Sequence, residues 1–308
     1  MRTIEQVSAM RAWSHEVRGR DQARIAVVPT MGALHPGHLS LVEIARRHAD
    51  KVVASVFVNP TQFDRADDFA RYPRDLERDG ALLAAAGVDV LFAPHASDMY
   101  PPGAQTMVTV EQLAVPLCGA HRPGHFGGVA TVVLKLLLIV HPHVAVFGEK
   151  DYQQLALIRR MVRDLHLEID VVGAPIVREA DGLAMSSRNR HLDAAERAAA
   201  RCLTRALAAA EERVAGGERD AAVFVAAAAA ELVQEPRARI EYAVAVHPET
   251  LAPLARLCDR DQRPVAPAAA ADVADRALLA LAVWIGTTRL IDNRLLTVPA
   301  ASRERKSA

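Results

Sequence analysis

The sequence predicts an α/β protein: a Rossmann-like, doubly wound parallel sheet followed by a smaller α+β C-terminal domain. Three observations support this. In the first half, β-branched runs alternate with helical segments, which is typical of parallel strands joined by helical crossovers. The second half has Ala-rich helices and strands of a different pattern. The chain has 308 residues, 51% of them hydrophobic, and at about 150 residues per domain this favours two domains. We place the boundary near Pro175, giving domains 1–175 and 176–308.

The elements of the first half follow one another in regular order. The expected strands are short apolar runs, and the expected helices are longer amphipathic or apolar segments that lie between them. The strands are expected at 25–28, 52–58, 88–92, 144–147 and 169–172, and the helices at 39–49, 74–86, 129–140 and 153–165. In such a sheet, ligands bind at the carboxyl ends of the strands.

The second half predicts helices packed on a small antiparallel sheet. Helices are expected at 194–215 and 221–233, joined at Gly216–Gly217, and strands at 240–246, 276–285 and 289–291. Residues 261–271 are low in complexity and predict a surface loop. The Ala-rich helices carry no obvious chemistry, so we interpret them as packing elements.

Composition argues against several partners. Lys plus Arg and Asp plus Glu are both 37, and aromatic residues are 4%, so nothing predicts binding to nucleic acid or to an anionic membrane. Arg303–Lys306 is a short terminal run of mixed charge and predicts a solvated end. The longest apolar run, Val129–Val140, is too short to cross a bilayer, and the first residues lack the apolar core of a signal peptide. Three separated cysteines fit a reducing compartment, so a cytoplasmic protein is expected.

The strongest local signal is the run Pro29–His38, PTMGALHPGH, which follows the first expected strand and opens a helix. A helix N-terminus after a strand is an anion site, because its free backbone N–H groups and its dipole face the ligand. His35 and His38 are three residues apart and would project together, and Gly37 would let a phosphate approach the backbone. The run predicts binding of nucleotide phosphates. Metal binding by the two histidines is the alternative.

Two further runs suit phosphate chemistry. Met185–Asn189, MSSRN, offers two hydroxyls and a guanidinium, although alone such a run usually marks a turn. Gly148–Asp151, GEKD, stands where a strand ends and a helix begins, so that Lys150 would neutralise phosphate charge. Asp151 either caps the following helix or binds ribose or metal.

Uncharged amides follow the same strand ends. Gln62 comes after the second strand, and either Gln153 or Gln154 should face the ligand; amides there suit the hydroxyl and carboxylate of a hydroxy acid. The run His121–Gly128 predicts a loop that contacts phosphate. His121 and His125 of this run, with His141 and His143, could form a metal cluster. No acidic or Cys partner stands at ligand spacing, which argues against zinc.

Six segments together resemble the pantoate–β-alanine ligase family. They are PTMGALHPGHLSLV (29–42), VFVNPTQF (56–63), GHFGGVATVVLKLL (124–137), FGEKDYQQLALIRRM (147–161), READGLAMSSRNRHL (178–192) and TTRLIDN (287–293). The HxGH and MSSR elements alone indicate only the wider nucleotidyltransferase superfamily, whereas the full set is specific. Residues 261–271 and the tail after Leu296 depart from the resemblance.

The resemblance implies condensation of (R)-pantoate with β-alanine, with ATP as co-substrate and Mg²⁺, to give (R)-pantothenate, AMP and diphosphate through a pantoyl adenylate. It implies a homodimer, a C-terminal domain that closes as a lid, and His38 as proton donor. The side chains expected to promote the chemistry are His35, His38, Lys150, Ser186, Ser187 and Arg188. The expected ATP contacts are Met31, Gly32, Ala33, Leu34, His35, Pro36, Gly37, His38, Gly148, Glu149, Lys150, Asp151, Val177, Met185, Ser186, Ser187 and Arg188. Gln62 would contact pantoate and β-alanine, and Gln154 pantoate.

Two alternatives remain open at this stage. A related adenylyl- or cytidylyltransferase would keep the nucleotide in its product, and release of free AMP distinguishes it. A catalytically silent nucleotide-binding regulator would be expected to lack some of the histidines, Lys150 or Arg188, and all of these are present.

Overall fold

A six-stranded sheet organises the first part of the chain. The computed structural model describes residues 1–63, 66–258 and 273–298. All neighbouring strands of this sheet are parallel, in the order β1-β4-β3-β2-β5-β6. The strands are β1 (Arg2–Ile4), β2 (Ile25–Thr30), β3 (Lys51–Val56), β4 (Val90–Phe92), β5 (Val144–Gly148) and β6 (Asp170–Ala174). From β2 the chain builds outward through β3 and β4, then returns to the other side of β2 for β5 and β6. This order confirms the doubly wound fold class.

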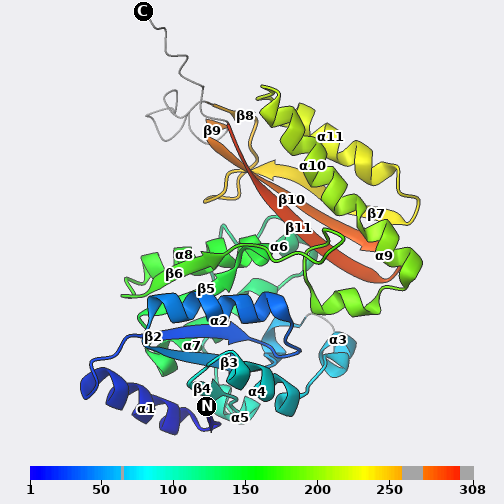
Figure 1. Ribbon diagram of the computed structural model, residues 1–308. Coiled ribbons are helices and arrows are strands. Elements are labelled where there is room, and N and C mark those ends of the chain that lie inside the picture. Colours follow the sequence, from blue (N-terminus) through cyan, green and yellow to red (C-terminus); the bar gives the residue numbers. More distant parts are fainter. Residues whose placement is uncertain (64–65, 259–272, 299–308) are drawn as a thin grey trace, which may run out of the picture. The chain divides into compact units, whose positions relative to one another are not determined.

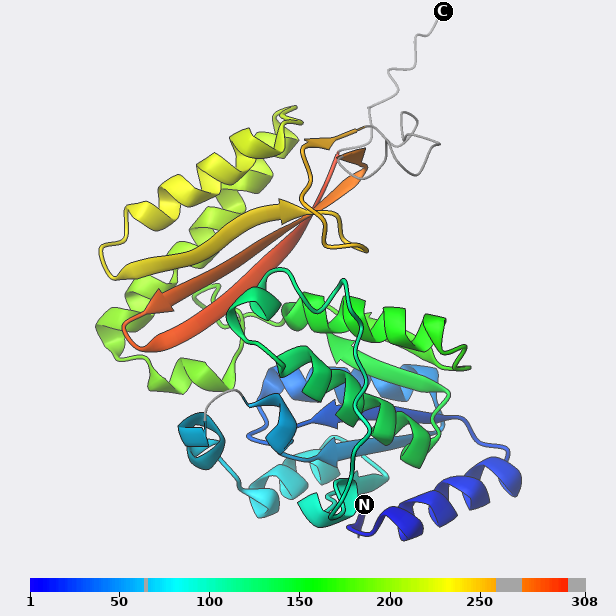
Figure 2. The ribbon, with the colours of Figure 1, turned by 180° about the vertical axis from the view of Figure 1, so that it is seen from behind.

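Helices cover both faces of this sheet. They are α1 (Val7–Gly19), α2 (Pro36–His48), α3 (Ala66–Arg71), α4 (Leu76–Ala85), α5 (Ala96–Met99), α6 (Cys118–His121), α7 (His125–Val140) and α8 (Tyr152–Asp164), with the 3₁₀ turns η1 (Pro60–Gln62) and η2 (Glu149–Asp151). Because side chains alternate along a strand, Ala26 and Val28 of β2 face one way and share a core with Leu41 of α2 and Leu83 of α4. Helix α7 packs on the opposite face, where Figure 2 shows it in front of the sheet.

The second part of the chain has its own core. Its three-stranded antiparallel sheet has the order β11-β10-β7, and α10 and α11 lie along one face of it (Figure 1). The elements are η3 (Ser187–His191), α9 (Ala194–Ala200), α10 (Cys202–Ala215), α11 (Ala221–Val233), β7 (Ala238–Val246), β8 (Arg256–Leu257), β9 (Val273–Ala274), β10 (Arg276–Ile285) and β11 (Thr288–Thr297). The expectation of helices on a small antiparallel sheet is confirmed.

Contacts divide the chain into two compact units. One consists of Met1–Glu179 with Ala184–Ser187, and the other of Ala180–Leu183 with the chain from Arg188 onward. The chain therefore passes between the units at three points in the READGLAMSSR segment. The division into domains at residue 175, with a lid function for the second, stays a prediction.

Several element boundaries differ from the sequence expectation. Strand β1 and helix α1 were not expected, although α1 buries Met10, Ser14 and Val17 at helical spacing. The helix expected over 194–215 is two helices separated at Arg201, and the strand expected over 289–291 extends to Thr297. Residues 261–271 and Arg303–Lys306 lie outside the described residues.

Candidate active site

The order of the parallel sheet reverses between β2 and β5, which are neighbours. At such a switch point the connections leave the strands in opposite directions, and ligands bind outside the carboxyl ends of the strands. Strand β2 ends at Thr30 and leads into the segment Met31–His38; β5 ends at Gly148 and leads into Glu149–Asp151. Two of the runs that the sequence assigns to phosphate chemistry therefore follow the two strands that meet there.

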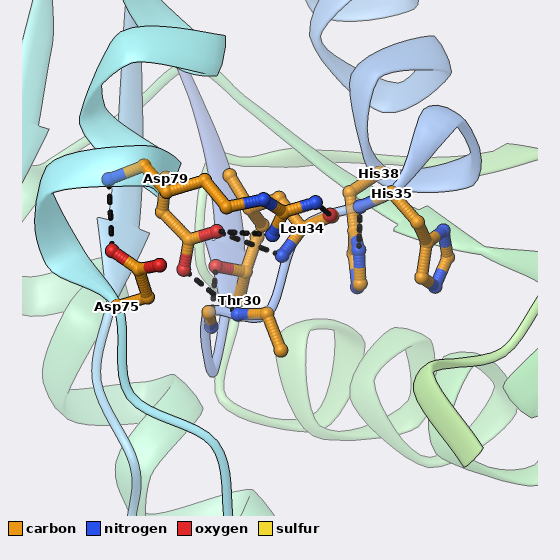
Figure 3. A network of polar contacts seen from close by, with 9 residues as sticks. Thr30, Leu34, His35, His38, Asp75 and Asp79 are labelled. Carbon is orange, nitrogen blue, oxygen red and sulfur yellow. Dashed lines mark hydrogen bonds and ion pairs between the residues drawn. The ribbon is translucent and has the colours of Figure 1, made fainter. Parts of the chain in front are cut away.

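The segment between β2 and α2 is held by Asp79, a residue of α4 that is 1% exposed. Its carboxylate accepts hydrogen bonds from the backbone N–H groups of Ala33 (2.7 Å) and Leu34 (2.9 Å), as Figure 3 shows. The backbone is left-handed at Gly32 and Ala33, with φ of +83° and +53°. A Cβ at Gly32 would stand 2.8 Å from Asp79 Oδ2, so this turn requires glycine. Sequence reasoning missed Asp79, because nothing in the helix pattern marks it as buried.

Most backbone N–H groups of this segment are used inside the protein. The N–H groups with partners are those of Gly32, Ala33, Leu34, His35, His38 and Leu39. Their acceptors are Thr30 Oγ1, the Asp79 carboxylate, His38 Nδ1 and the His35 carbonyl oxygen. The expectation that free backbone donors of this turn face a phosphate is wrong for these groups. Side chains are therefore the main candidates for contacting an anion here.

The two histidine rings lie against each other. His35 is the N-cap residue of α2 and His38 lies in its first turn; their ring centroids are 4.0 Å apart, with the planes tilted by 34°. Gly37 makes room for this pair, because a Cβ there would stand 2.9 Å from His35 Cε1. Figure 3 shows both rings at the start of the helix.

His38 is neutral at pH 7. Burial, with a smaller contribution from His35, lowers the pKa of His38 to about 3. Its Nδ1 accepts the N–H of His35 (3.4 Å), which assigns the ring proton to Nε2. The ring can therefore donate a hydrogen bond from Nε2, while the free protein holds no imidazolium proton there to give away.

Lys150 and Asp151 lie close to His38. Both act on the pKa of His38, Asp151 raising it and Lys150 lowering it, and Lys150 Nζ is 3.8 Å from Asp151 Oδ2. The Lys150 side chain is only 18% exposed. Asp151 occupies the N-cap position of α8, but its side chain makes no capping hydrogen bond. The capping interpretation of Asp151 is therefore wrong.

Gln62 belongs to a buried network of amides and hydroxyls after β3. Tyr100 Oη (2.8 Å) and Thr61 Oγ1 (3.0 Å) donate to Asn59 Oδ1, and Asn59 Nδ2 donates to Gln62 Oε1 (3.1 Å). This chain assigns both amide orientations, because each oxygen faces donors. The remaining amide end, Gln62 Nε2, lies against Met31 Sδ (2.8 Å). Asn59 and Tyr100 were not expected, although Asn59 also follows an expected strand.

The first turn of helix α7 packs against the turn at Asn59–Gln62. Asn59 Nδ2 also donates to the carbonyl of Gly128 (3.1 Å), and His125 Nδ1 donates to the carbonyl of Gln62 (2.8 Å). A Cβ at Gly128 would stand 2.3 Å from the Thr61 carbonyl oxygen. The run His121–Gly128, expected as a loop, includes the first turn of α7.

The two glutamines that open α8 have different surroundings. Gln153 is buried and commits its amide to one loop: its Oε1 accepts from the Cys118 N–H (3.0 Å), and its Nε2 donates to the carbonyls of Leu113 (2.9 Å) and Pro116 (2.6 Å). Gln153 therefore fastens the loop before α6. Gln154 is the member of the pair left to face a ligand.

The MSSR run is divided between the two compact units. The Met185 N–H donates to the Val177 carbonyl (2.9 Å), and Met185 Cβ lies 3.5 Å from the position of a Cβ on Gly37. Val177 and Met185–Ser187 belong to the first unit, whereas Arg188 belongs to the second. The sequence alone does not reveal this division.

The other histidines lie in separate places, with His125 at one end of α7 and His141 and His143 at the other. His125 opens α7, whereas His141 is its C-cap and His143 Nδ1 accepts the N–H of Ile25 (3.0 Å). Within the part of the chain that the structure describes, no three His, Cys, Asp or Glu side chains are placed to hold a metal ion. In the same residues no helix combines the length and apolar character needed to cross a membrane.

The doubly wound sheet, with paired histidines directly after β2 at the switch point between β2 and β5, defines the class of protein as a nucleotide-binding α/β enzyme. The family model for pantoate-beta-alanine ligase matches residues 2–295. The chain belongs to the pantoate–β-alanine ligase family, and its reaction is the ATP-dependent condensation of (R)-pantoate with β-alanine to (R)-pantothenate.

Individual relatives are similar over nearly their whole length. The chain is 53% identical to pantothenate synthetase of Geobacter sulfurreducens, over 96% of this chain and 99% of that one. A crystal structure of pantothenate synthetase from Thermus thermophilus has 49% identity, a TM-score of 0.84, and coverage of 96% and 99%. The pantoate-beta-alanine ligase of Francisella tularensis, solved with beta-gamma ATP and β-alanine, has 32% identity, a TM-score of 0.71, and coverage of 96% and 97%.

Proposed function

We propose that the chain forms pantothenate in two chemical steps at the switch point of its parallel sheet. In the first, a carboxylate oxygen of pantoate attacks the α-phosphorus of ATP, the bond from that phosphorus to the diphosphate breaks, and pantoyl adenylate forms. In the second, the amine of β-alanine attacks the acyl carbon, AMP leaves with the bridging oxygen, and the amine loses a proton. The single observation that carries this proposal is a neutral, half-buried His38 packed on His35 and close to Lys150.

The first step needs positioning and charge stabilisation more than proton transfer. Lys150, little exposed, neutralises phosphate charge, and His38 donates a hydrogen bond from Nε2 to the oxygen on which negative charge develops. His35, Ser186, Ser187 and Arg188 supply further donors to the phosphates. His38 therefore acts as a hydrogen-bond donor, which differs from the proton-donor role that the resemblance implies.

The acceptor substrates are recognised by amides. Gln62 offers Nε2, because its Oε1 accepts from Asn59. An N–H₂ group suits the carboxylate oxygens of pantoate and β-alanine. We assign Gln154 to pantoate, since the amide of Gln153 is fully engaged in its loop.

We propose that ATP binds at the carboxyl ends of β2 and β5. We assign to its binding the groups named from the sequence, which are Met31–His38, Gly148–Asp151, Val177 and Met185–Arg188. The Francisella relative, solved with beta-gamma ATP and β-alanine, supports both as substrates.

Mg²⁺ enters with ATP in this proposal. Mg²⁺ is usually held by one or two carboxylates plus substrate phosphates, and the Asp151 carboxylate, close enough to His38 to raise its pKa, fits that donor set. The ion would neutralise diphosphate charge. Residues 176–308 would close as a lid that protects the adenylate from water. A homodimer in the cytoplasm completes the proposal.

Omission of substrates tests this function. Purified protein is incubated with ATP, Mg²⁺, (R)-pantoate and β-alanine, each left out in turn, and AMP and pantothenate are quantified. We expect equal amounts of both products, dependent on all three substrates, and enzyme-bound pantoyl adenylate when β-alanine is absent. Transfer of the nucleotide into a stable product without free AMP would instead support the related nucleotidyltransferase.

A further inference from the structure

Asp79 is a negative charge buried beside a segment that receives a polyanion. Its carboxylate is 1% exposed and accepts the backbone N–H groups of Ala33 and Leu34. Arg78 Nη1, 3.7 Å from Asp79 Oδ1, is its nearest positive group in the ion pairs of the described residues. Because like charges repel, a carboxylate at this place disfavours the binding of phosphate. Its presence there indicates that it has another role.

The contacts of Asp79 show what that role is. The two N–H groups it binds immediately precede His35, the N-cap residue of α2, and His38 lies in the next turn of the chain. Ala33, with φ of +53°, has a left-handed backbone that costs a residue with a side chain about 1 kcal/mol or more. A short ionic hydrogen bond holds this conformation in place. Figure 3 shows the Asp79 carboxylate on one side of the turn at Leu34 and the two histidine rings on the other.

We propose that Asp79 is a positioning residue for the histidine pair. It fixes the left-handed turn at Gly32–Ala33 and so sets where α2 begins and where the His35 and His38 rings stand. In this proposal Asp79 acts through the backbone of the turn, which its carboxylate binds at Ala33 and Leu34. This proposal rests on the proposed function for its kinetic effect, but not for its effect on the two rings.

Asp79→Asn tests the proposal in the full chain. Asn has the same shape, but it accepts through one oxygen only and turns an NH₂ group toward the second N–H. Asp75→Asn is the matched control, because Asp75 lies at the start of the same helix and its side chain, among the described residues, accepts only the Arg78 N–H, within its own turn. We expect Asp79→Asn to lower kcat about 10- to 100-fold with KM for ATP changed less than about threefold. Asp75→Asn should keep kcat within about twofold.

An NMR readout separates positioning from stability. ¹⁵N spectra of the imidazoles, recorded without substrates, should show altered ring resonances for His35 and His38 in Asp79→Asn and unchanged ones in Asp75→Asn. Unchanged resonances and a kcat within about twofold of wild type would overturn the proposal, as would equal losses in both variants that follow the thermal midpoint. If wild-type protein makes no pantothenate, the proposed function fails while this comparison of spectra still tests Asp79.

Arg78→Ala keeps the test open if Asp79→Asn does not fold. The Arg78 side chain is 55% exposed, and its Nη2 donates to the Leu34 carbonyl (3.3 Å), the other side of the same turn. We expect folded protein, a fall in kcat of about threefold and a shift of the His35 resonances. An unchanged kcat together with unchanged His35 resonances in folded Arg78→Ala would count against the proposal.

Discussion

The carboxyl ends of β2 and β3 are neighbours, with Thr30 opposite Val56, yet they hold their functional side chains by different means. After β2, a buried carboxylate holds the backbone and leaves the histidine rings as the groups with chemistry. After β3, neutral hydroxyls and amides hold the Gln62 side chain, and no residue of this turn has a positive φ.

The difference matches two tasks. Stabilising charge that develops on a phosphate requires donors fixed by a rigid backbone, because a donor displaced by 1 Å loses much of its effect. Recognising a carboxylate requires an amide whose NH₂ group faces the substrate. A network that donates hydrogen bonds to the amide oxygen fixes this orientation. Changes after β2 should therefore lower kcat, and changes after β3 should raise KM for the acceptor substrates.

The largest effect is expected after β2 and at the end of β5. His38→Ala and Lys150→Ala should each lower kcat about 10²- to 10³-fold, because each removes a group that stabilises developing charge. His48→Ala, at the exposed end of the same helix, is the control and should leave kcat unchanged. Steady-state kinetics with circular dichroism checks this. Near-normal turnover in both variants would contradict the assignment.

Gly128→Ala should break the arrangement after β3. Its Cβ would meet the Thr61 carbonyl at 2.3 Å and the Gln62 nitrogen at 2.8 Å, so η1 must move. We expect a loss of about 1–3 kcal/mol in the free energy of unfolding and an increase of about tenfold in KM for pantoate. Gly127→Ala is the matched control, since its nearest atoms are 3.9 Å away. Equal behaviour of the two variants in denaturation and kinetics would show that α7 does not constrain this turn.

Tyr100→Phe and Thr61→Val each remove one hydroxyl from Asn59 Oδ1. Each should raise KM for pantoate or β-alanine about twofold to fivefold, with KM for ATP unchanged. The double variant should exceed the product of the two, because the Asn59 amide then loses both donors that fix its orientation. Thr61→Ser retains the hydroxyl and should behave as wild type. Simple multiplication in the double-mutant cycle would argue against a shared network.

The last prediction concerns the pH dependence of stability and not the kinetics. The pKa of His38 is lowered in the folded state, so below the ordinary value near 6.5 the unfolded state binds a proton that the folded state does not. Stability is therefore present above pH 6.5 and is lost as pH falls towards 3. Between pH 7.5 and 5.0, wild type should lose about 1–2 kcal/mol more than His38→Gln in urea unfolding. Equal losses would indicate that His38 titrates normally.

The sequence predicted the parts of the site that depend on local order. Strand, turn and helix follow one another at Pro29–His38 and at Gly148–Asp151, and the alternation of strands and helices implies that such ends meet. What escaped prediction depends on contacts between distant residues. Asp79 reaches Ala33 across 46 positions, and its burial follows from how α4 packs on the sheet.

Protonation also escaped prediction from the sequence. The HxGH spacing is the same whether His38 is charged or neutral. Its pKa is lowered by the surroundings that the fold provides, chiefly burial, with smaller contributions from His35 and Lys150. Similarly, the two glutamines at the start of α8 are equal as sequence, and only the loop around Leu113 and Cys118 makes Gln153 a structural residue.

Transfer of an oxygen isotope tests the central claim, that pantoate is activated as an adenylate at this site. (R)-Pantoate labelled with ¹⁸O in its carboxylate is converted with ATP and β-alanine, and AMP, diphosphate and pantothenate are examined by mass spectrometry. The account predicts one ¹⁸O in AMP, because the carboxylate oxygen that attacks the α-phosphorus leaves with it, and none in diphosphate. Unlabelled AMP, with ¹⁸O found instead in diphosphate or phosphate, would contradict it.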